Sequence, residues 1–456
     1  MSKFVRADGR VIYTQTTLTK QQKEAIGLLS IGTFLEYFDL MLYVHMAVLL
    51  NELFFPKADP YTTAIYSATA FCATFVFRPI GALIIGWIGD NIGRKATVII
   101  TTSMMAISCI IMANLPTYAQ IGITATWIMT ICRIAQGMSS MGEIMGSQLY
   151  LTEITKPPKQ YPVVALVDAF AAIGSAAALG IASIVTSFEL NWRIAFWIGA
   201  CIAVIGSLAR TALRETPEFA DAKRRVKKIL ENTDTNKKIL EDDPIWQEKT
   251  KEKTILALFL MDCSWPLTFY FAFIYCGNIL KNSFGYGGEQ VIHHNFLVSI
   301  YMIVYMLFIT YLSYKIYPLK ILKIKIIITF IFIPFCPYLL DHVITTPFYL
   351  MLFQLFFLTF SPSKTPAFPI IFKHFPIFKR FTYSNLSYAL SRAIMYIITS
   401  FSIVYLIKYF GNLGVWIIMI PVYVGYSYGL YHFEQLEKKA GNYPQKSSLD
   451  PVLDVV

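Results

Sequence analysis

Twelve long apolar runs constrain the fold of this chain more than any other feature. A helix needs about 20 consecutive apolar residues to cross the hydrocarbon core of a bilayer. Hydrophobic residues make up 56% of the sequence and charged residues 15%, whereas a soluble domain carries about 25% charged residues. The sequence therefore predicts an all-α integral membrane protein with twelve transmembrane helices. The predicted spans are approximately 25–50, 63–89, 97–115, 122–153, 162–188, 192–213, 254–280, 293–314, 321–340, 347–372, 382–408 and 414–433.

Positive charge is distributed unevenly between the loops on the two sides of these spans. If the N-terminus is cytoplasmic, only four of the 39 Lys and Arg residues fall in or beside loops on the outer side: Lys57, Arg193, Lys281 and Lys408. This asymmetry follows the positive-inside rule. We therefore expect a multi-pass protein of the inner (plasma) membrane with both termini in the cytoplasm. The net charge of +11 then reflects topology and contact with membrane lipid, and it does not indicate a nucleic-acid partner.

The spans form two groups of six. Residues 214–253 between the groups hold eleven bases and ten acids and resemble a solvated cytoplasmic linker. Six spans, a long inner loop and six more spans are typical of transporters built from two bundles around a central site. The predicted organisation is a cytoplasmic tail (1–24), a first six-helix bundle (25–213), the linker, a second six-helix bundle (254–433) and a C-terminal tail (434–456).

The turn between the second and third spans has the sequence GWIGDNIGRK, residues 86–95. It carries one acid, two bases and three glycines in a very short connection. A passive connector needs neither the charges nor the glycines. The turn is typical of a gate, where helix ends must approach closely, lock and release.

Ionisable residues within the spans are candidates for function, because a charge at the bilayer centre costs about 2.5–3.5 kcal/mol on insertion scales. Glu36 and Asp39 lie three residues apart, on one face of the first span. Arg133, Gln136 and Glu143 follow one stripe of the fourth span. An acid of the first span could pair with Arg133 and act as a proton switch, since protonation releases the arginine. The alternative is a static ion pair that only fixes the packing.

Four other charged residues within the spans are weaker candidates. Lys364 lies in Ser-Pro-Ser-Lys-Thr-Pro (361–366), which is not expected to be regular helix, and broken helices at membrane depth line protein or a cavity. Lys364 is thus a candidate for substrate contact. Asp168 and Asp262 could line the path or lie in wet helix ends. Arg78, which precedes a proline, could be a structural residue that reaches the membrane interface.

No pattern in the sequence indicates an enzyme or a cofactor. The sequence has no nucleophile constellation, and the absence of a GxxxxGK[ST] loop argues against an ATP-driven pump. None of the seven cysteines has CxxC spacing, so no metal site is predicted.

Several segments resemble the metabolite:proton symporter family of the major facilitator superfamily. The turn matches the superfamily pattern G-x-x-x-D-x-x-G-R-K at five positions: Gly86, Asp90, Gly93, Arg94 and Lys95. GTFLEYFDLMLY (32–43), FRPIGALIIGWIGD (77–90), RIAQGMSSMGE (133–143) and NWRIAFWIG (191–199) are similar to patterns of that family. The proline/betaine transporters are the members that the chain resembles.

The resemblance implies a major facilitator fold that alternates between inward-open and outward-open forms, without enzymatic activity or cofactor. It implies proton-coupled uptake of a small organic solute, such as a zwitterion like proline or glycine betaine. We separately expect the protein to be a monomer. By position, Asp39 and Arg133 would form the proton-linked pair. Glu36, Gln136 and Glu143 would line or border the cavity. Asp90 with Arg94 would latch the two halves on the cytoplasmic side.

Two alternatives remain open at this point. A carboxylate carrier of the same family, for example for 2-oxoglutarate, would use Arg133 and Lys364 to hold a dicarboxylate. A non-transporting solute sensor is the alternative of another class. The loop SYKIYPLKILKIK (313–325) lacks a second copy of the Asp-Gly-Arg motif, so we do not expect symmetric gating.

Overall fold

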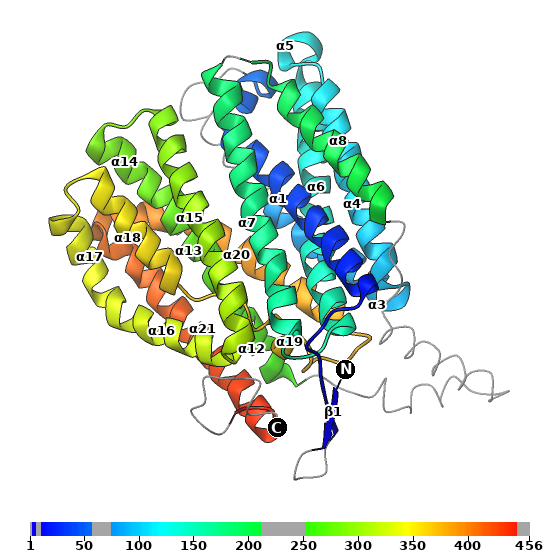
Figure 1. Ribbon diagram of the computed structural model, residues 1–456. Coiled ribbons are helices and arrows are strands. Elements are labelled where there is room, and N and C mark those ends of the chain that lie inside the picture. The colour runs from blue at the N-terminus through cyan, green and yellow to red at the C-terminus, as the bar shows by residue number, and fades with distance from the viewer. Residues whose placement is uncertain (1, 6–10, 57–73, 189, 211–250, 445–456) are drawn as a thin grey trace.

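The computed structural model describes residues 2–5, 11–56, 74–188, 190–210 and 251–444. Within these ranges the chain is built mainly of long helices, and the two marked chain ends lie at the same end of the molecule (Figure 1). We call this the terminal end. The first-half helices are α1 (Lys20–Phe54), α3 (Arg78–Asn91), α4 (Arg94–Asn114), α5 (Tyr118–Ile121), α6 (Ile123–Ile154), α7 (Gln160–Ser187) and α8 (Arg193–Arg210).

The second half follows the predicted spans but with more breaks. Its elements are α12 (Glu252–Asp262), α13 (Ser264–Phe269), the π-helical turn η1 (Tyr270–Tyr275), α14 (Cys276–Phe284), α15 (Gly288–Lys315), α16 (Pro318–Phe332), the short turns η2 (Ile333–Phe335), α17 (Cys336–Tyr338) and η3 (Leu339–Val343), α18 (Pro347–Phe360), α19 (Phe368–Phe372), α20 (Arg380–Phe410) and α21 (Leu413–Lys439).

The N-terminal tail forms a short hairpin that the sequence analysis did not predict. Strand β1 (Ser2–Val5) pairs in antiparallel fashion with β2 (Val11–Thr14). Most of the predicted linker, residues 214–253, lies outside the described residues. The predicted domain boundaries there therefore stay predictions.

The tenth predicted span, 347–372, is not one helix. Helix α18 ends at Phe360, and the chain is irregular until α19 begins at Phe368. Pro362 and Pro366 lack the N–H that a helix requires, and a proline also disfavours helical backbone in the residue before it. Lys364, in the middle of this break, is buried. The irregular backbone is thus enclosed in protein, as membrane depth demands.

Small residues bring the helices of the first half close together. A Cβ atom on Gly174 of α7 would lie 2.1 Å from the backbone oxygen of Phe34 in α1, and one on Gly137 of α6 would lie 2.3 Å from that of Thr74. Only glycine leaves room for such approaches. In the second half aromatic rings fill the space instead, and the ring of Phe271 lies 4.7 Å from that of Phe357 and 5.4 Å from that of Trp416.

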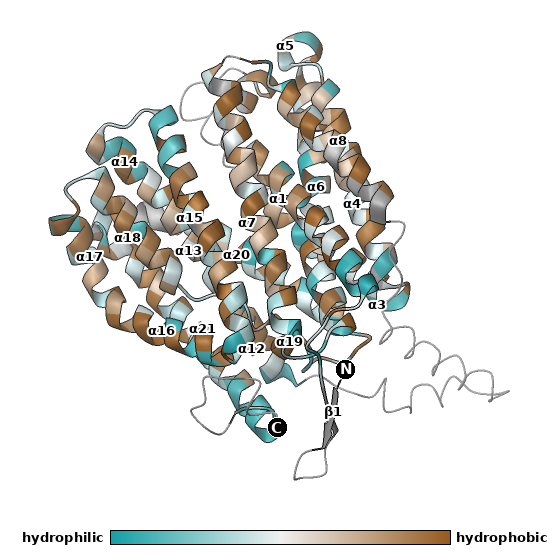
Figure 2. Cartoon of the chain, in the orientation of Figure 1, coloured by the Kyte–Doolittle hydropathy of each residue, from teal (hydrophilic) through white to brown (hydrophobic). Residues whose placement is uncertain are grey.

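Apolar side chains also cover the outside of the helices, as the brown faces in Figure 2 show. Trp87, Trp127 and Ile331 are each more than half exposed. Exposed apolar area of this kind needs a lipid or protein environment. Six of the described helices are long and apolar enough to cross a membrane by length and composition.

The two halves meet mainly where α7 packs against α15 and α3 packs against α20, with further contacts of α6 with α19 and α20 and of α7 with α19. Phe368, Phe372 and Phe381 of the second half join the apolar core formed by α3, α6 and α7. This contact lies toward the terminal end and leaves a cavity between the halves.

Candidate functional site

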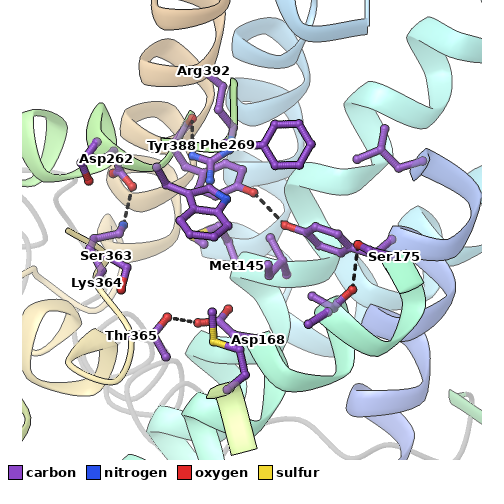
Figure 3. Close-up of a pocket in the computed structure, with 18 of the residues that line it drawn as sticks. Met145, Asp168, Ser175, Asp262, Phe269, Ser363, Lys364, Thr365, Tyr388 and Arg392 are labelled. Atoms are coloured by element: carbon purple, nitrogen blue, oxygen red, sulfur yellow. Dashed lines mark hydrogen bonds and ion pairs between the residues drawn. The ribbon is translucent and has the colours of Figure 1, made fainter. Parts of the chain in front are cut away.

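The cavity between the halves has a volume of about 170 Å³ and is lined by residues of both. Pockets for drug-sized ligands span about 300–1,000 Å³, so this cavity favours a smaller solute. Five charged residues line it: Arg78 and Asp168 from the first half, and Asp262, Lys364 and Arg392 from the second. Figure 3 shows several of these side chains directed toward the same space.

Asp262 and Lys364 form a buried ion pair on the second-half wall. Lys364 Nζ lies 2.5 Å from Asp262 Oδ1, and the two side chains are 7% and 2% exposed respectively. Ser387 donates a hydrogen bond of 2.7 Å to the other oxygen of Asp262. The break between α18 and α19 carries Lys364 to this acid at the end of α12. The predicted substrate contact Lys364 thus lines the cavity, although its charge is already matched.

Asp168 holds the broken segment to the first half. Its oxygens accept hydrogen bonds from Thr365 and, at 2.9 Å, from Gln148 Nε2. Helix α7 supplies Asp168, α6 supplies Gln148, and Thr365 belongs to the second half (Figure 3). The carboxylate therefore joins the halves beside the cavity.

Arg78 and Arg392 face the cavity from opposite halves, each against aromatic rings. The Arg78 guanidinium lies 4.5 Å from the ring centre of Phe75, and that of Arg392 lies 3.2 Å from the ring centre of Tyr388. The hydroxyls of Tyr388 and Tyr37 are 3.3 Å apart. Stacking on an aromatic face attracts an arginine through the ring quadrupole, so the rings hold both cations in place.

Asp39 lies inside the first half and does not line the cavity. It is buried, and neither of its oxygens accepts a hydrogen bond from a nitrogen or oxygen donor of the described residues. The Cys109 thiol is its weak hydrogen-bond neighbour, and the Arg133 guanidinium acts on it electrostatically. A Cβ on Gly199 of α8 would lie 2.2 Å from Asp39 Oδ1, so the carboxylate fits only against a glycine.

Arg133 is oriented by Gln136. The Arg133 Nη1 donates a hydrogen bond of 2.8 Å to Gln136 Oε1, and Gln136 Nε2 donates to Cys109 Sγ at 3.4 Å. The structure thus arranges Arg133, Gln136 and Cys109 as a chain that leads to Asp39. Within the described residues it does not place Asp39 and Arg133 in a direct ion pair.

The remaining predicted cavity residues are placed differently. Gln136 is fully buried, hydrogen-bonded to Arg133 and Cys109, and is not among the residues that line the cavity. Glu36 is buried in α1, within electrostatic range of Arg78. Glu143 lies in α6, but its side chain is outside the described part of the structure.

Asp90 joins the end of α3 to the start of α20. Its Oδ2 accepts hydrogen bonds from the backbone N–H of Thr382 at 2.9 Å and from the Thr382 hydroxyl at 2.7 Å, and its Oδ1 accepts from the Phe381 N–H at 3.3 Å. The first N–H groups of a helix have no partner inside it, and the helix dipole favours an anion there. Asp90 therefore caps a helix of the opposite half.

The glycines of the turn permit this contact. A Cβ on Gly86 would lie 2.9 Å from the Cα of Thr382, and one on Gly89 would lie 2.9 Å from the ring of Phe381. Gly93 has φ of +146°, which side-chain-bearing residues rarely adopt. Arg94 and Lys95 begin α4, and the Arg94 side chain is not described.

Two further contacts close the same end of the molecule. Arg380 Nη1 lies 3.5 Å from Glu153 Oε1, and Lys373 Nζ donates a hydrogen bond of 2.7 Å to Gln160 Oε1. Each links the segment before or at the start of α20 to the first half. The halves are therefore tied together at the terminal end by Asp90, Glu153 and Gln160.

The corresponding connection in the second half, between α15 and α16, is hydrogen-bonded to its own bundle, although Tyr314 also contacts Lys159 and Tyr317 contacts Tyr161 of the first half. Tyr317 donates a hydrogen bond of 2.6 Å to Glu437, and Lys323 pairs with Glu434 at 3.2 Å. Both acids belong to α21. His374 also contacts Glu437, at 2.8 Å.

From the sequence alone, Arg78, Asp168 and Asp262 were only weak candidates for function, and Arg392 had no assigned role. Each was visible as a charge within an apolar run, but the runs do not show which charges meet. The aromatic partners Tyr37, Phe75 and Tyr388 gave no signal, because rings are frequent throughout the chain. Gly199 belongs to the segment 191–199, which resembles a pattern of the family, but no role was predicted for this glycine.

Comparison with known proteins supports the resemblance. The chain is 30% identical over 298 residues to the proline/betaine transporter of Salmonella typhimurium, covering 63% of this chain and 58% of that protein. It is 33% identical over 195 residues to the citrate-proton symporter of Klebsiella pneumoniae, covering 41% and 44%. The chain thus spans less than two thirds of the length of these relatives.

The fold matches that of solved transporters. The proton:xylose symporter XylE from E. coli aligns with a TM-score of 0.68 at 12% identity, covering 95% of this chain and 98% of that one. The predicted fold and the resemblance to proline/betaine transporters are confirmed. Because the sequence model of the Major Facilitator Superfamily matches residues 29–400, the chain belongs to that superfamily.

Proposed function

We propose that this protein is a secondary active transporter that moves a small organic solute together with protons by alternating access. The observation that carries the proposal is the cavity between the halves, where charged side chains from both halves face one space while the terminal end is tied shut. Breaking the ties at one end and forming others opposite would expose the cavity to each side in turn.

The solute that we propose first is a zwitterion of the proline or glycine betaine type. The arginines offer donors to a carboxylate. Aromatic residues of the lining, among them Trp265, Phe269 and Tyr396, offer ring faces to a substituted ammonium group. The name of the Salmonella relative supports the same class.

A second candidate is a carboxylate such as 2-oxoglutarate. The cavity holds three cationic residues and two acids, which favours an anionic solute. The contacts of Arg133 within the first half remove it from this role, so Arg78 and Arg392 would replace it. The Klebsiella relative is named as a citrate-proton symporter.

Proton coupling is assigned to Asp39. A carboxyl group that is buried without a nitrogen or oxygen donor is costly to ionise, and Arg133 favours its charged form. Loss or gain of a proton would change how Arg133 and Gln136 are held and thereby shift α6 against α1. The alternative is a static group that only supports packing.

Gating is assigned to the Asp90 contact with α20. It is an ion–dipole contact at a helix end, so its strength is a few kcal/mol at most, small enough to break in each transport cycle. We further propose that the protein lies in the inner membrane as a monomer, with both termini cytoplasmic. The terminal end is then the cytoplasmic side.

The decisive experiment is uptake into proteoliposomes. Labelled glycine betaine, proline, 2-oxoglutarate and citrate are tested under an inward proton gradient, with and without a protonophore. We expect accumulation of one solute class that the protonophore abolishes. Binding without accumulation would instead indicate the sensor alternative, and accumulation that ignores the protonophore would contradict proton coupling.

A further inference from the structure

We propose that Arg78 and Arg392 together bind one carboxylate of the transported solute and thereby determine specificity for carboxylate-bearing solutes. This inference rests on the proposed transport function and names residues of the same site. It differs from a site built on Arg133 and Lys364, because Arg133 is held within the first half and Lys364 is paired with Asp262.

Arg78 is a buried cation with unused donors. Its side chain lines the cavity, and the residue is 2% exposed. Its Nε and Nη2 atoms have no hydrogen-bond partner among the residues that the structure describes. A buried donor without an acceptor carries a desolvation cost of about 1–3 kcal/mol, and more when charged. A ligand that accepts from these atoms would recover that cost.

Arg392 is in a similar position on the opposite wall. Its one hydrogen bond among the described residues runs from Nη1 to the backbone oxygen of Tyr388 at a long 3.4 Å. Its guanidinium carbon lies 3.2 Å from the centre of the Tyr388 ring, and its other N–H groups are left for a ligand. Figure 3 shows the Arg392 and Tyr388 side chains together at the edge of the pocket.

The two arginines act on one another electrostatically across the cavity. Two like charges in a buried site repel. Glu36 attracts Arg78 and Asp262 attracts Arg392 electrostatically, but the lining acids are bound to other partners. Asp262 is matched by Lys364, and Asp168 accepts from Gln148 and Thr365. A carboxylate between the arginines would remove the repulsion and supply acceptors for both planar forks, for which arginine is well suited.

The origin of the two residues gives the site a second property. Arg78 begins α3 in the first half, and Arg392 lies in α20 of the second. A carboxylate held by both would bridge the halves. Solute binding would therefore favour the form in which the halves are close, as coupling of binding to closure requires.

The test uses the purified full chain in detergent and measures thermal stabilisation by three probes. Glycine betaine and 2-oxoglutarate carry a carboxylate. Choline keeps the quaternary ammonium group of betaine but has an alcohol in place of the carboxylate. We expect stabilisation by at least one carboxylate probe and none by choline. Equal effects of choline and betaine, or no effect of either carboxylate, would overturn the inference without any variant.

Variants then locate the site. Arg78→Gln and Arg392→Gln should each weaken binding of the active carboxylate about 10- to 100-fold, the range for a hydrogen bond to a charged group. Arg193→Gln is the matched control, because Arg193 lies at the start of α8 outside the cavity lining. Wild-type affinity in both cavity variants would contradict the inference.

Two further readouts separate binding from a structural role. Ligand-free Arg78→Gln should be at least as heat-stable as the wild type, because it removes a buried charge with two donors that have no partner among the described residues. If it does not elute as a single species, Arg78→Lys keeps the charge but loses the fork, and wild-type affinity there would exclude fork binding. Carboxylate binding without pH-driven accumulation would refute transport and leave this site intact.

Discussion

The buried acids of the two halves differ in whether a cation is bound to them. In the first half Asp39 is enclosed by α1, α4, α6 and α8, away from the cavity and without a nitrogen or oxygen donor among the described residues. In the second half Asp262 lies on the cavity wall and is bound to Lys364. The comparison teaches that protonation of Asp39 would break no ion pair among the described residues, whereas protonation of Asp262 would weaken its contact with Lys364.

The corresponding helix-joining turns of the two halves also differ in the contacts that they make. The turn after α3 sends Asp90 across to α20, while the connection between α15 and α16 is held by Glu434 and Glu437 of its own bundle. The α15–α16 connection reaches the first half through the rings of Tyr314 and Tyr317, and not, among the described residues, through a carboxylate that caps a helix of the other half. Four predictions test these contrasts, beginning with the largest effect.

Asp39→Asn should abolish accumulation driven by a pH gradient and leave some solute exchange. The amide keeps the shape of the carboxyl group but cannot take up or release the proton. Uptake and counterflow in proteoliposomes measure the two activities, and Glu252→Gln, at the exposed start of α12, serves as control. Unimpaired pH-driven accumulation would remove Asp39 from the proton pathway.

Lys364→Met should lower the free energy of unfolding by about 3–5 kcal/mol, because it leaves Asp262 charged and buried. The double variant with Asp262→Asn should recover most of that loss. Fluorescence-monitored thermal unfolding in detergent compares the two. Asp39→Asn should show no such loss, since Asp39 has no fixed cation to lose. Equal stability of the single and double variants would mean that the cost of removing Lys364 does not come from leaving Asp262 charged.

Asp90→Asn should loosen the terminal end. Loss of an anion at a helix N-terminus costs up to about 2 kcal/mol, which corresponds to roughly a 30-fold change in the population of the closed form. A cysteine at Ala172, on the cavity wall, reports this through its rate of alkylation by an impermeant maleimide from the terminal side. A rate equal to that of the Ala172→Cys parent would show that Asp90 does not hold the gate.

Glu437→Gln should have the smallest effect and is the matched control for Asp90. It weakens contacts with Tyr317 and His374 within one half, so the free energy of unfolding should fall by about 1 kcal/mol. The alkylation rate at position 172 should not change. A change as large as that in Asp90→Asn would mean that the second-half connection also gates.

Much of the fold was predictable from the sequence because spanning a bilayer demands long apolar helices. The twelve runs, the gate turn and the irregular segment around Lys364 were visible from hydropathy, glycine and proline alone. The prolines indicated irregular backbone after Phe360, but the predicted span 347–372 nevertheless continued across this segment. The helix could not continue because two prolines within five residues remove its donors.

The site was less predictable because its members come from distant segments. Arg78 and Arg392 are more than 300 residues apart, and periodicity says nothing about such pairs. The stripe of Arg133 and Gln136 was found correctly as one helix face. The sequence could not show whether Arg133 contacts Asp39 directly or is connected to it through Gln136 and Cys109, because this depends on how α4 and α6 are rotated about their axes.

The sequence by itself determined the membrane class, the two groups of spans and the motif at residues 86–95, because these depend on local composition and on the length that a bilayer requires. Only the tertiary structure decided which charges are matched. It bound Lys364 to Asp262, capped α20 with Asp90 and left two donors of Arg78 without a partner among the described residues. The reason is physical: the cost of a buried charge depends on the atoms within a few ångströms of it, and those atoms come from other helices.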